Sequence, residues 1–335
     1  MKKLVVPILM VFILCAGKAH AGMSEFMTYT ANGAGLSVDA VGLRNNVLGT
    51  VSVDLPAGAS VYKAFLYSAS VWSGGLSDVE FGGSTLVSNA ASRLDVGAKN
   101  ANAASENRWD VTSIVQSTVG GGSGVFDFNV KELGSLDGEI LAVLYNVATD
   151  PLSTAMIFDG ELATTGDSFA INLATPVDKT NPDFDAIMSL GISYGFQGGG
   201  QFTTVDVNGN RLTSSAGGQD DGFSSNGGLI TAGGIGDSID NPLDPNAPPS
   251  NFRTDDELYN LESFLTNGDT VINIRTRNPS NDDNVFFMGF TTLGLASVGP
   301  LPPPTNVVPE PASMMLLGSG LIGMFGLRKK KQVKT

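Results

Sequence analysis

Residues 139–147 read Glu-Ile-Leu-Ala-Val-Leu-Tyr-Asn-Val, and this almost unbroken apolar run decides the fold class of the chain. A strand with one solvated face alternates apolar and polar side chains, whereas a strand buried on both faces is apolar nearly throughout. The run therefore predicts a central β-strand that is covered by protein on both sides.

The segments around this run also have the sequence pattern of β-strands. Apolar residues alternate at period two in residues 61–67, 124–130 and 270–274. Residues 201–207 and 210–214 flank Asn208-Gly209, which is the strongest short-range signal for a β-hairpin. We therefore expect several antiparallel strands joined by short turns.

Only two segments have a helical pattern. The first begins at Asp110 as N-cap and covers residues 111–119, and the second is capped near Thr254 and covers residues 255–265. Many short strands with glycine-rich turns (42 glycines in 335 residues) indicate an all-β fold, a β-sandwich or jelly-roll-like body with one or two short helices. We expect one large sandwich over residues 22–298, with two sandwiches as the alternative.

The charge balance excludes one class of partner. The 33 acidic residues outnumber the 19 lysines and arginines, so the net charge is −14. Nucleic-acid binding depends on cations that neutralise phosphates, and we therefore expect no nucleic acid as a partner. The same negative surface attracts divalent cations.

The N-terminus has the three parts of a secretory signal peptide. Lys2 and Lys3 precede the apolar stretch 4–14, and Ala19 and Ala21 supply the small residues that signal peptidase requires. Cleavage after Ala21 removes residues 1–21, which hold Cys15 and His20, the only cysteine and histidine. The mature protein then has no disulfide, no thiolate nucleophile and no imidazole base.

The composition changes again near the C-terminus. Residues 299–308 form a proline-rich linker. Its last residue, Val308, begins the motif Val308, Pro309, Glu310 and Pro311. Residues 312–327 are apolar apart from small glycines and serines, and they predict a short transmembrane helix. Its stop signal is the basic cluster Arg328, Lys329, Lys330 and Lys331, which predicts a cytoplasmic C-terminal end.

This order of Val-Pro-Glu-Pro, short apolar helix and basic end resembles the PEP-CTERM sorting signal of Gram-negative exported proteins, over residues 307–331. The resemblance implies processing by exosortase, a membrane-embedded protease-transpeptidase, within a segment 309–331. It also implies a precursor anchored in the inner membrane and facing the periplasm. The mature protein would then reach the cell surface or the extracellular matrix, with exopolysaccharide or other surface polymers as partners.

Two loops carry the candidate metal ligands. Asp220, Asp221, Asp237, Asp240 and Asp244 lie in glycine-rich or polar loops, and carboxylate oxygens are the ligands that calcium prefers. The alternative is a solvated acidic surface. We expect no cofactor apart from this calcium.

The residues favour a protein without catalytic activity. The main alternative is a carbohydrate-binding module. An enzyme that hydrolyses carbohydrate is the third hypothesis, because it needs two carboxylates and no histidine. Its candidate pairs are Asp137 with Glu139 and Asp159 with Glu161, but each Asp-Gly-Glu is also typical of a turn before a strand.

Lys63 is the remaining residue of interest. Period two places it on one strand face with Val61, Phe65 and Tyr67, a face that is expected to turn inward. A lysine there must form an isopeptide crosslink, or lay its stem on the core while its charge reaches water or pairs with an acid. We favour the lysine without a crosslink.

Overall fold

The computed structural model describes residues 22–43, 47–71, 77–94, 104–160, 162–163, 165–193, 203–216, 230–247, 256–279 and 284–299. These residues form antiparallel β-strands, β1 to β19, with an α-helix and a 3-10 helix between them. The predicted all-β sandwich is therefore confirmed.

The strands belong to four sheets, which we number I to IV. Sheet I has the order β3 (Leu48–Leu55), β8 (Gly124–Glu132), β5 (Val79–Phe81) and β6 (Ser84–Leu86). Sheet II has the order β2 (Gly35–Gly42), β9 (Gly138–Val147), β4 (Ala59–Val71) and β7 (Ala104–Asp110). Both sheets come from the first half of the chain.

Sheets III and IV come mainly from the second half. Sheet III has the order β1 (Ser24–Asn32), β10 (Leu152–Asp159), β18 (Asn284–Leu293), β12 (Ala186–Ser193) and β15 (Ile230–Ala232), and β16 (Leu258–Asn260) also pairs with β12. Sheet IV has the order β14 (Asn210–Ala216), β13 (Thr203–Val207), β17 (Val271–Arg277), β11 (Ser168–Leu173) and β19 (Ala296–Gly299).

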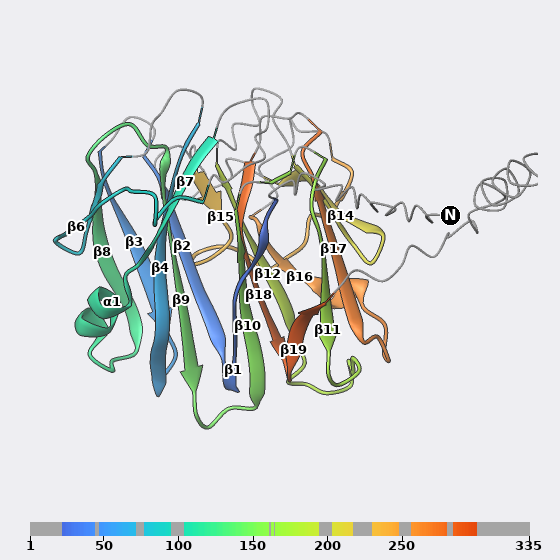
Figure 1. Cartoon of the computed structure of the whole chain (residues 1–335). Coiled ribbons are helices and arrows are strands. Elements are labelled where there is room, and N and C mark those ends of the chain that lie inside the picture. Colours follow the sequence, from blue (N-terminus) through green and yellow to red (C-terminus); the bar gives the residue numbers. More distant parts are fainter. Residues whose placement is uncertain are drawn as a thin grey trace, which may run out of the picture. The chain divides into compact units, whose positions relative to one another are not determined.

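The four sheets stack in numerical order, with an apolar core between each neighbouring pair. Figure 1 shows this stack from β8 and β3 on the left to β17 and β14 on the right. The core between sheets I and II includes Phe128 and Leu141, and the core between sheets III and IV includes Ile274 and Phe290. A third core, which includes Ile140, lies between sheets II and III, so the two sandwiches pack against each other through their inner sheets.

Strand β9 is the predicted strand with two buried faces. Leu141 and Val143 point into the core between sheets I and II, whereas Ile140 and Ala142 point into the core between sheets II and III. Its apolar run is therefore explained by its position in an inner sheet.

The other predicted strands are also present. Segments 61–67, 124–130 and 270–274 fall almost wholly within β4, β8 and β17. The predicted hairpin joins β13 to β14, and positive φ angles at Asn208 (47°) and Gly209 (80°) fit a type I′ turn.

The first predicted helix is confirmed with its start moved by one residue. Helix α1 covers Thr112–Val119, and Val115 and Val119 are its buried side chains. Asp110 lies just before the helix, where its Oδ1 accepts a hydrogen bond from the amide of Thr112 at 3.0 Å. The N-cap residue itself is Val111, so the prediction of Asp110 as N-cap is wrong by one position, although its carboxylate still binds an orphan donor at the helix start.

The second predicted helix, residues 255–265, is wrong. Within the described part of this segment the chain forms β16 and then the 3-10 helix η3 (Leu261–Phe264). Glu257 has a φ of +53°, which a right-handed helix does not allow, and β16 pairs with β12. Pairing with a distant strand has overridden the local helical pattern.

Both predicted terminal segments lie outside the described residues. Residues 1–21 and 300–335 are not described, and Gly299 is the last residue of β19 rather than part of the linker. Within the described ranges, no helix has the length and apolar character needed to cross a bilayer. The predicted span 312–327 lies outside these ranges.

Candidate functional site

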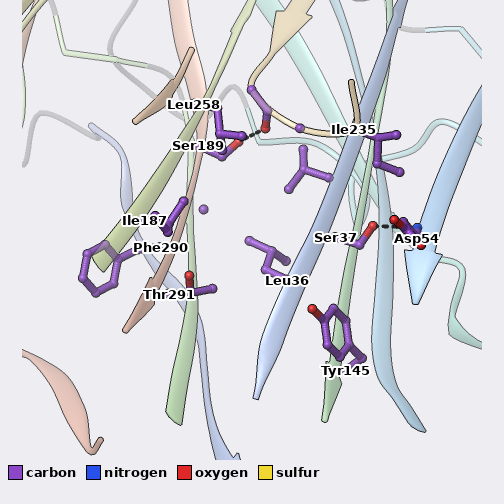
Figure 2. A pocket seen from close by; sticks show the side chains of 14 residues that line it. Leu36, Ser37, Asp54, Tyr145, Ile187, Ser189, Ile235, Leu258, Phe290 and Thr291 are labelled. Atoms are coloured by element: carbon purple, nitrogen blue, oxygen red, sulfur yellow. Dashed lines mark hydrogen bonds between the residues drawn. The ribbon is translucent and has the colours of Figure 1, made fainter. Parts of the chain in front are cut away.

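A groove runs along the boundary between sheets II and III. Two hollows of about 360 and 340 Å³ share Leu36, Tyr145 and Thr291, so they lie next to each other. Figure 2 shows its larger half, with Leu36 from β2 and Tyr145 from β9 facing Thr291 from β18. We call these two hollows together the sheet II–III groove.

Glycines allow the strands beneath the groove to approach closely. A Cβ on Gly289 would lie 2.4 Å from Cδ2 of Leu36, so a larger residue there would push the Leu36 side chain aside. A Cβ on Gly234 would lie 2.1 Å from the carbonyl oxygen of Val38. The segment after β15 thereby extends the edge of sheet II, and the amide of Ile235 donates to Val38 O at 2.9 Å.

One half of the groove combines apolar side chains with Asp54 and two serines. Ile187, Leu258 and Phe290 line it from sheet III (Figure 2). Its two serines already have partners, because Ser37 Oγ accepts from the amide of Asp54 at 3.0 Å and Ser189 Oγ donates to a backbone carbonyl at 2.5 Å. This half can therefore bind the apolar face of a ligand.

The other half is acidic. Asp150, Asp183 and Asp185 line it, and Tyr145 stands where the two halves meet. Burial raises the pKa of Tyr145, and the negative charges of Asp54, Asp185 and Asp150 raise it further. The tyrosine therefore stays neutral, and the aspartates can accept hydrogen bonds from hydroxyl groups.

The carboxylates proposed as catalytic pairs lie elsewhere. Glu139 has no exposed surface, and burial, followed by the nearby Glu132, holds its pKa well above the usual range. Asp159 is buried, accepts a hydrogen bond from Tyr67 Oη at 3.0 Å and forms an ion pair with Arg108. Its proposed partner Glu161 lies outside the described residues.

The candidate calcium ligands are partly described. Asp220 and Asp221 lie outside the described residues. Asp237 Oδ2 accepts from the amide of Gly234 at 2.6 Å, and Asp244 Oδ1 accepts from the amide of Asn246 at 3.0 Å. Both carboxylates thus stabilise turns in the described loop.

Asp240 lines a separate hollow of about 430 Å³ together with Glu262 and Lys179. Lys179 Nζ donates to the carbonyl oxygen of Glu262 at 2.9 Å, which places a cation at this hollow. Among the described residues, no three acidic, histidine or cysteine side chains gather as metal ligands. Calcium between these loops stays a prediction.

Lys63 reaches water and pairs with an acid, in line with the favoured interpretation, but its predicted strand face is partly wrong. Lys63 Nζ lies 2.8 Å from Asp110 Oδ2, and both side chains are well exposed. A β-bulge between Val61 and Lys63 changes the alternation, so Val61 packs in the core between sheets I and II while Phe65 packs on the opposite face.

The terminal processing sites were predicted from sequence alone. Ala19, Ala21, Val308–Pro311 and Arg328–Lys331 are outside the described residues. The family model for the PEP-CTERM protein-sorting motif matches residues 307–331. This chain carries a PEP-CTERM sorting signal. The PEP-CTERM signal implies export to the cell envelope or surface, with exosortase as the processing partner.

Comparison of the whole PEP-CTERM chain with curated proteins and solved structures identifies no relative of its β-rich body. No curated protein matches it. Among solved structures, the major capsid protein P2 from bacteriophage PM2 matches with a TM-score of 0.22 and 13% sequence identity, over 80% of this chain and 98% of the capsid protein. A TM-score this low does not equate the two folds.

Sequence reasoning missed the sheet II–III groove because strands from distant parts of the chain assemble it. One local signal was present, since Tyr145-Asn146 interrupts the apolar run of 139–147 with polar groups. These two residues are half-buried in a strand that is otherwise buried. The interruption thus marks where β9 reaches the surface.

Proposed function

We propose that this protein is a non-enzymatic component of the cell surface or extracellular matrix, delivered as an inner-membrane-anchored precursor. The observation that carries the proposal is the sorting signal at residues 307–331, behind a β-rich body that signal peptidase would release into the periplasm. The localisation at the surface and the transient membrane anchor are both part of this proposal.

The positions of the carboxylates support the absence of catalysis. Glycoside hydrolysis needs two carboxyl groups that both reach the sugar, about 5–10 Å apart. Glu139 is buried within the fold, and Asp159 is held by Arg108 and Tyr67. Neither is available to a substrate in this arrangement.

Localisation tests the sorting part of the proposal. We would express the full chain in a Gram-negative host with exosortase and compare it with a Glu310→Ala, Pro311→Ala variant. The wild type should appear in the surface or matrix fraction, whereas the variant should stay in the inner-membrane fraction. Equal distribution of the two proteins would contradict the proposal.

An activity measurement tests the non-enzymatic part. The purified native protein should release no reducing ends from exopolysaccharide of the same cells. Release that disappears in Glu139→Gln or Asp159→Asn would replace the proposal with a carbohydrate-active enzyme.

Carbohydrate binding is the second candidate, and the sheet II–III groove favours it. The groove combines apolar side chains with aspartates around Tyr145, and sugars present both apolar ring faces and hydroxyl groups. Tyr145→Ala should reduce retention on exopolysaccharide at least about tenfold, which corresponds to 1.4 kcal/mol. The matched control is Tyr62→Ala, which removes an exposed tyrosine that does not line the groove. Equal retention of both variants would reject the groove as a sugar site.

A further inference from the structure

Two buried glutamates flank the loop that carries the chain from sheet I to sheet II. Glu132 is the last residue of β8, Glu139 is the second residue of β9, and residues 133–137 connect them. Their exposed fractions are 6% and 0%. Acidic residues are almost never buried this completely without a partner.

The register of the strands shows where these side chains point. Glu139 is paired with Ser68 on β4, and the next pair on the same face, Leu141 with Leu66, lies in the core between sheets I and II. Directly paired residues of neighbouring strands share a face. Glu139 and Ser68 therefore point together toward sheet I.

Glu132 comes from the opposite wall of the same core. Val130, two residues before it, and Val79, its partner on β5, both belong to the core between sheets I and II. The negative charge of Glu132 contributes to the raised pKa of Glu139, so the two carboxyl groups are close enough to interact.

Several oxygens at this place lack hydrogen-bond donors. In the described structure, both carboxyl oxygens of Glu139, Oε1 of Glu132 and Oγ of Ser68 are buried without a partner. The amide of Leu136 donates a hydrogen bond to the carboxyl group of Glu132, and the negative charge of Asp137 also acts on this carboxyl group. Burying two carboxylates in this way is costly unless protons or a cation neutralise them.

We propose that Glu132, Glu139 and Ser68 bind a divalent cation, with calcium as the expected ion, at the end of the core between sheets I and II. Two carboxylates balance the charge of the ion, and an all-oxygen donor set fits a hard cation such as calcium. Backbone carbonyls and waters would supply the remaining ligands. The ion would connect sheet I to sheet II.

This site is separate from the loops of Asp237 and Asp240, and it does not depend on sorting or on sugar binding.

Calorimetry measures the binding directly. We would titrate chelator-treated full-length protein in mild detergent with calcium chloride at pH 7.5, and the Glu132→Gln variant in parallel. The wild type should bind calcium saturably, and the variant should bind it at least about tenfold more weakly. Absence of saturable binding by the wild type, or equal binding by the variant, would overturn the proposal.

Thermal unfolding of variants locates the site. Calcium at about 100 times its Kd should raise the Tm of the wild type by about 5 °C. Glu132→Gln and Glu139→Gln should abolish this shift, while the exposed Glu80→Gln and the loop variant Asp240→Asn should keep it. A shift that survives both glutamate variants, or is lost only in Asp240→Asn, would place calcium elsewhere. No shift in the wild type, together with a Tm that rises on acidification from pH 8 to 6, would show that protons alone neutralise the glutamates.

Discussion

At the scale of residues, the buried ion pair of Arg108 with Asp159 joins the two sandwiches. Arg108 comes from sheet II and Asp159 from sheet III, and Tyr67 Oη donates to the same carboxylate at 3.0 Å. The guanidinium carbon of Arg108 also lies 3.3 Å from the ring centre of Phe26. Asp159 therefore has a structural partner for its charge, although its Asp-Gly-Glu sequence suggested a catalytic carboxylate.

This pair predicts that an Arg108 variant loses much more free energy of unfolding than a Lys63 variant. Arg108→Met leaves Asp159 buried without its cation, and should lower the free energy of unfolding by about 3 kcal/mol or more. Lys63→Met breaks the exposed pair with Asp110 and should cost less than about 1 kcal/mol. Urea denaturation of both variants measures the difference, and equal losses would contradict the role of Arg108.

The buried acids predict how stability depends on pH when calcium is removed. The pKa of Glu132 is raised to about 8 and that of Asp39 to about 6, in both cases chiefly by burial. Both values exceed those of the unfolded chain, about 4, so the folded state binds more protons in between. The free energy of unfolding should fall by several kcal/mol as pH rises from about 4 to 8, and Glu132→Gln should reduce this fall. Urea denaturation in chelator at several pH values checks this, and increasing stability over the range would contradict it.

At the scale of elements, a bulge in β4 redirects one side chain. Tyr62 is the extra residue between Val61 and Lys63, and its ring stacks on Tyr29 of sheet III with centres 4.0 Å apart. A bulge changes which face of a strand each residue occupies, and strict alternation cannot reveal it. This is why the sequence placed Val61 on the wrong face.

Alanine at Gly138, at the start of β9, should lower the free energy of unfolding more than alanine at Gly209, in the turn between β13 and β14. Gly138 has a φ of +141°, and an added Cβ would lie 2.1 Å from the carbonyl oxygen of Val41. Gly138→Ala should therefore cost about 3 kcal/mol or more through backbone strain and steric overlap. Gly209 also has a positive φ, of 80°, but its Cβ would meet nothing within 4 Å. Gly209→Ala should cost only about 1 kcal/mol, and similar urea midpoints for the two variants would contradict the close approach of β9 to β2.

Local features of the elements were predictable from the sequence, and long-range pairings were not. The Asn208-Gly209 hairpin, the strand at 139–147 and helix α1 each depend on a short stretch of chain. Strand β16 instead depends on hydrogen bonds to β12, about 70 residues earlier in the chain. The acidic first turn expected for a helix at 255–265 could not reveal that pairing.

At the scale of the whole molecule, the N-terminal strand joins the two halves of the body. Strand β1 precedes all strands of sheets I and II, yet it pairs with β10 at the edge of sheet III. The sheet II–III groove is likewise assembled from β2, β9, β12 and β18. Neither feature leaves a periodic pattern in one segment, which is why the sequence left open whether one or two sandwiches form.

The intact mass of the mature protein, isolated from a cell with exosortase, tests the central claim most directly. Signal peptidase and exosortase should together remove residues 1–21 and the segment after about Pro309–Pro311, so the mass should correspond to a chain without Arg328–Lys331. C-terminal peptide mapping should place the new end at this motif. A mature protein that retains Arg328–Lys331 in such a cell would contradict sorting through the PEP-CTERM signal.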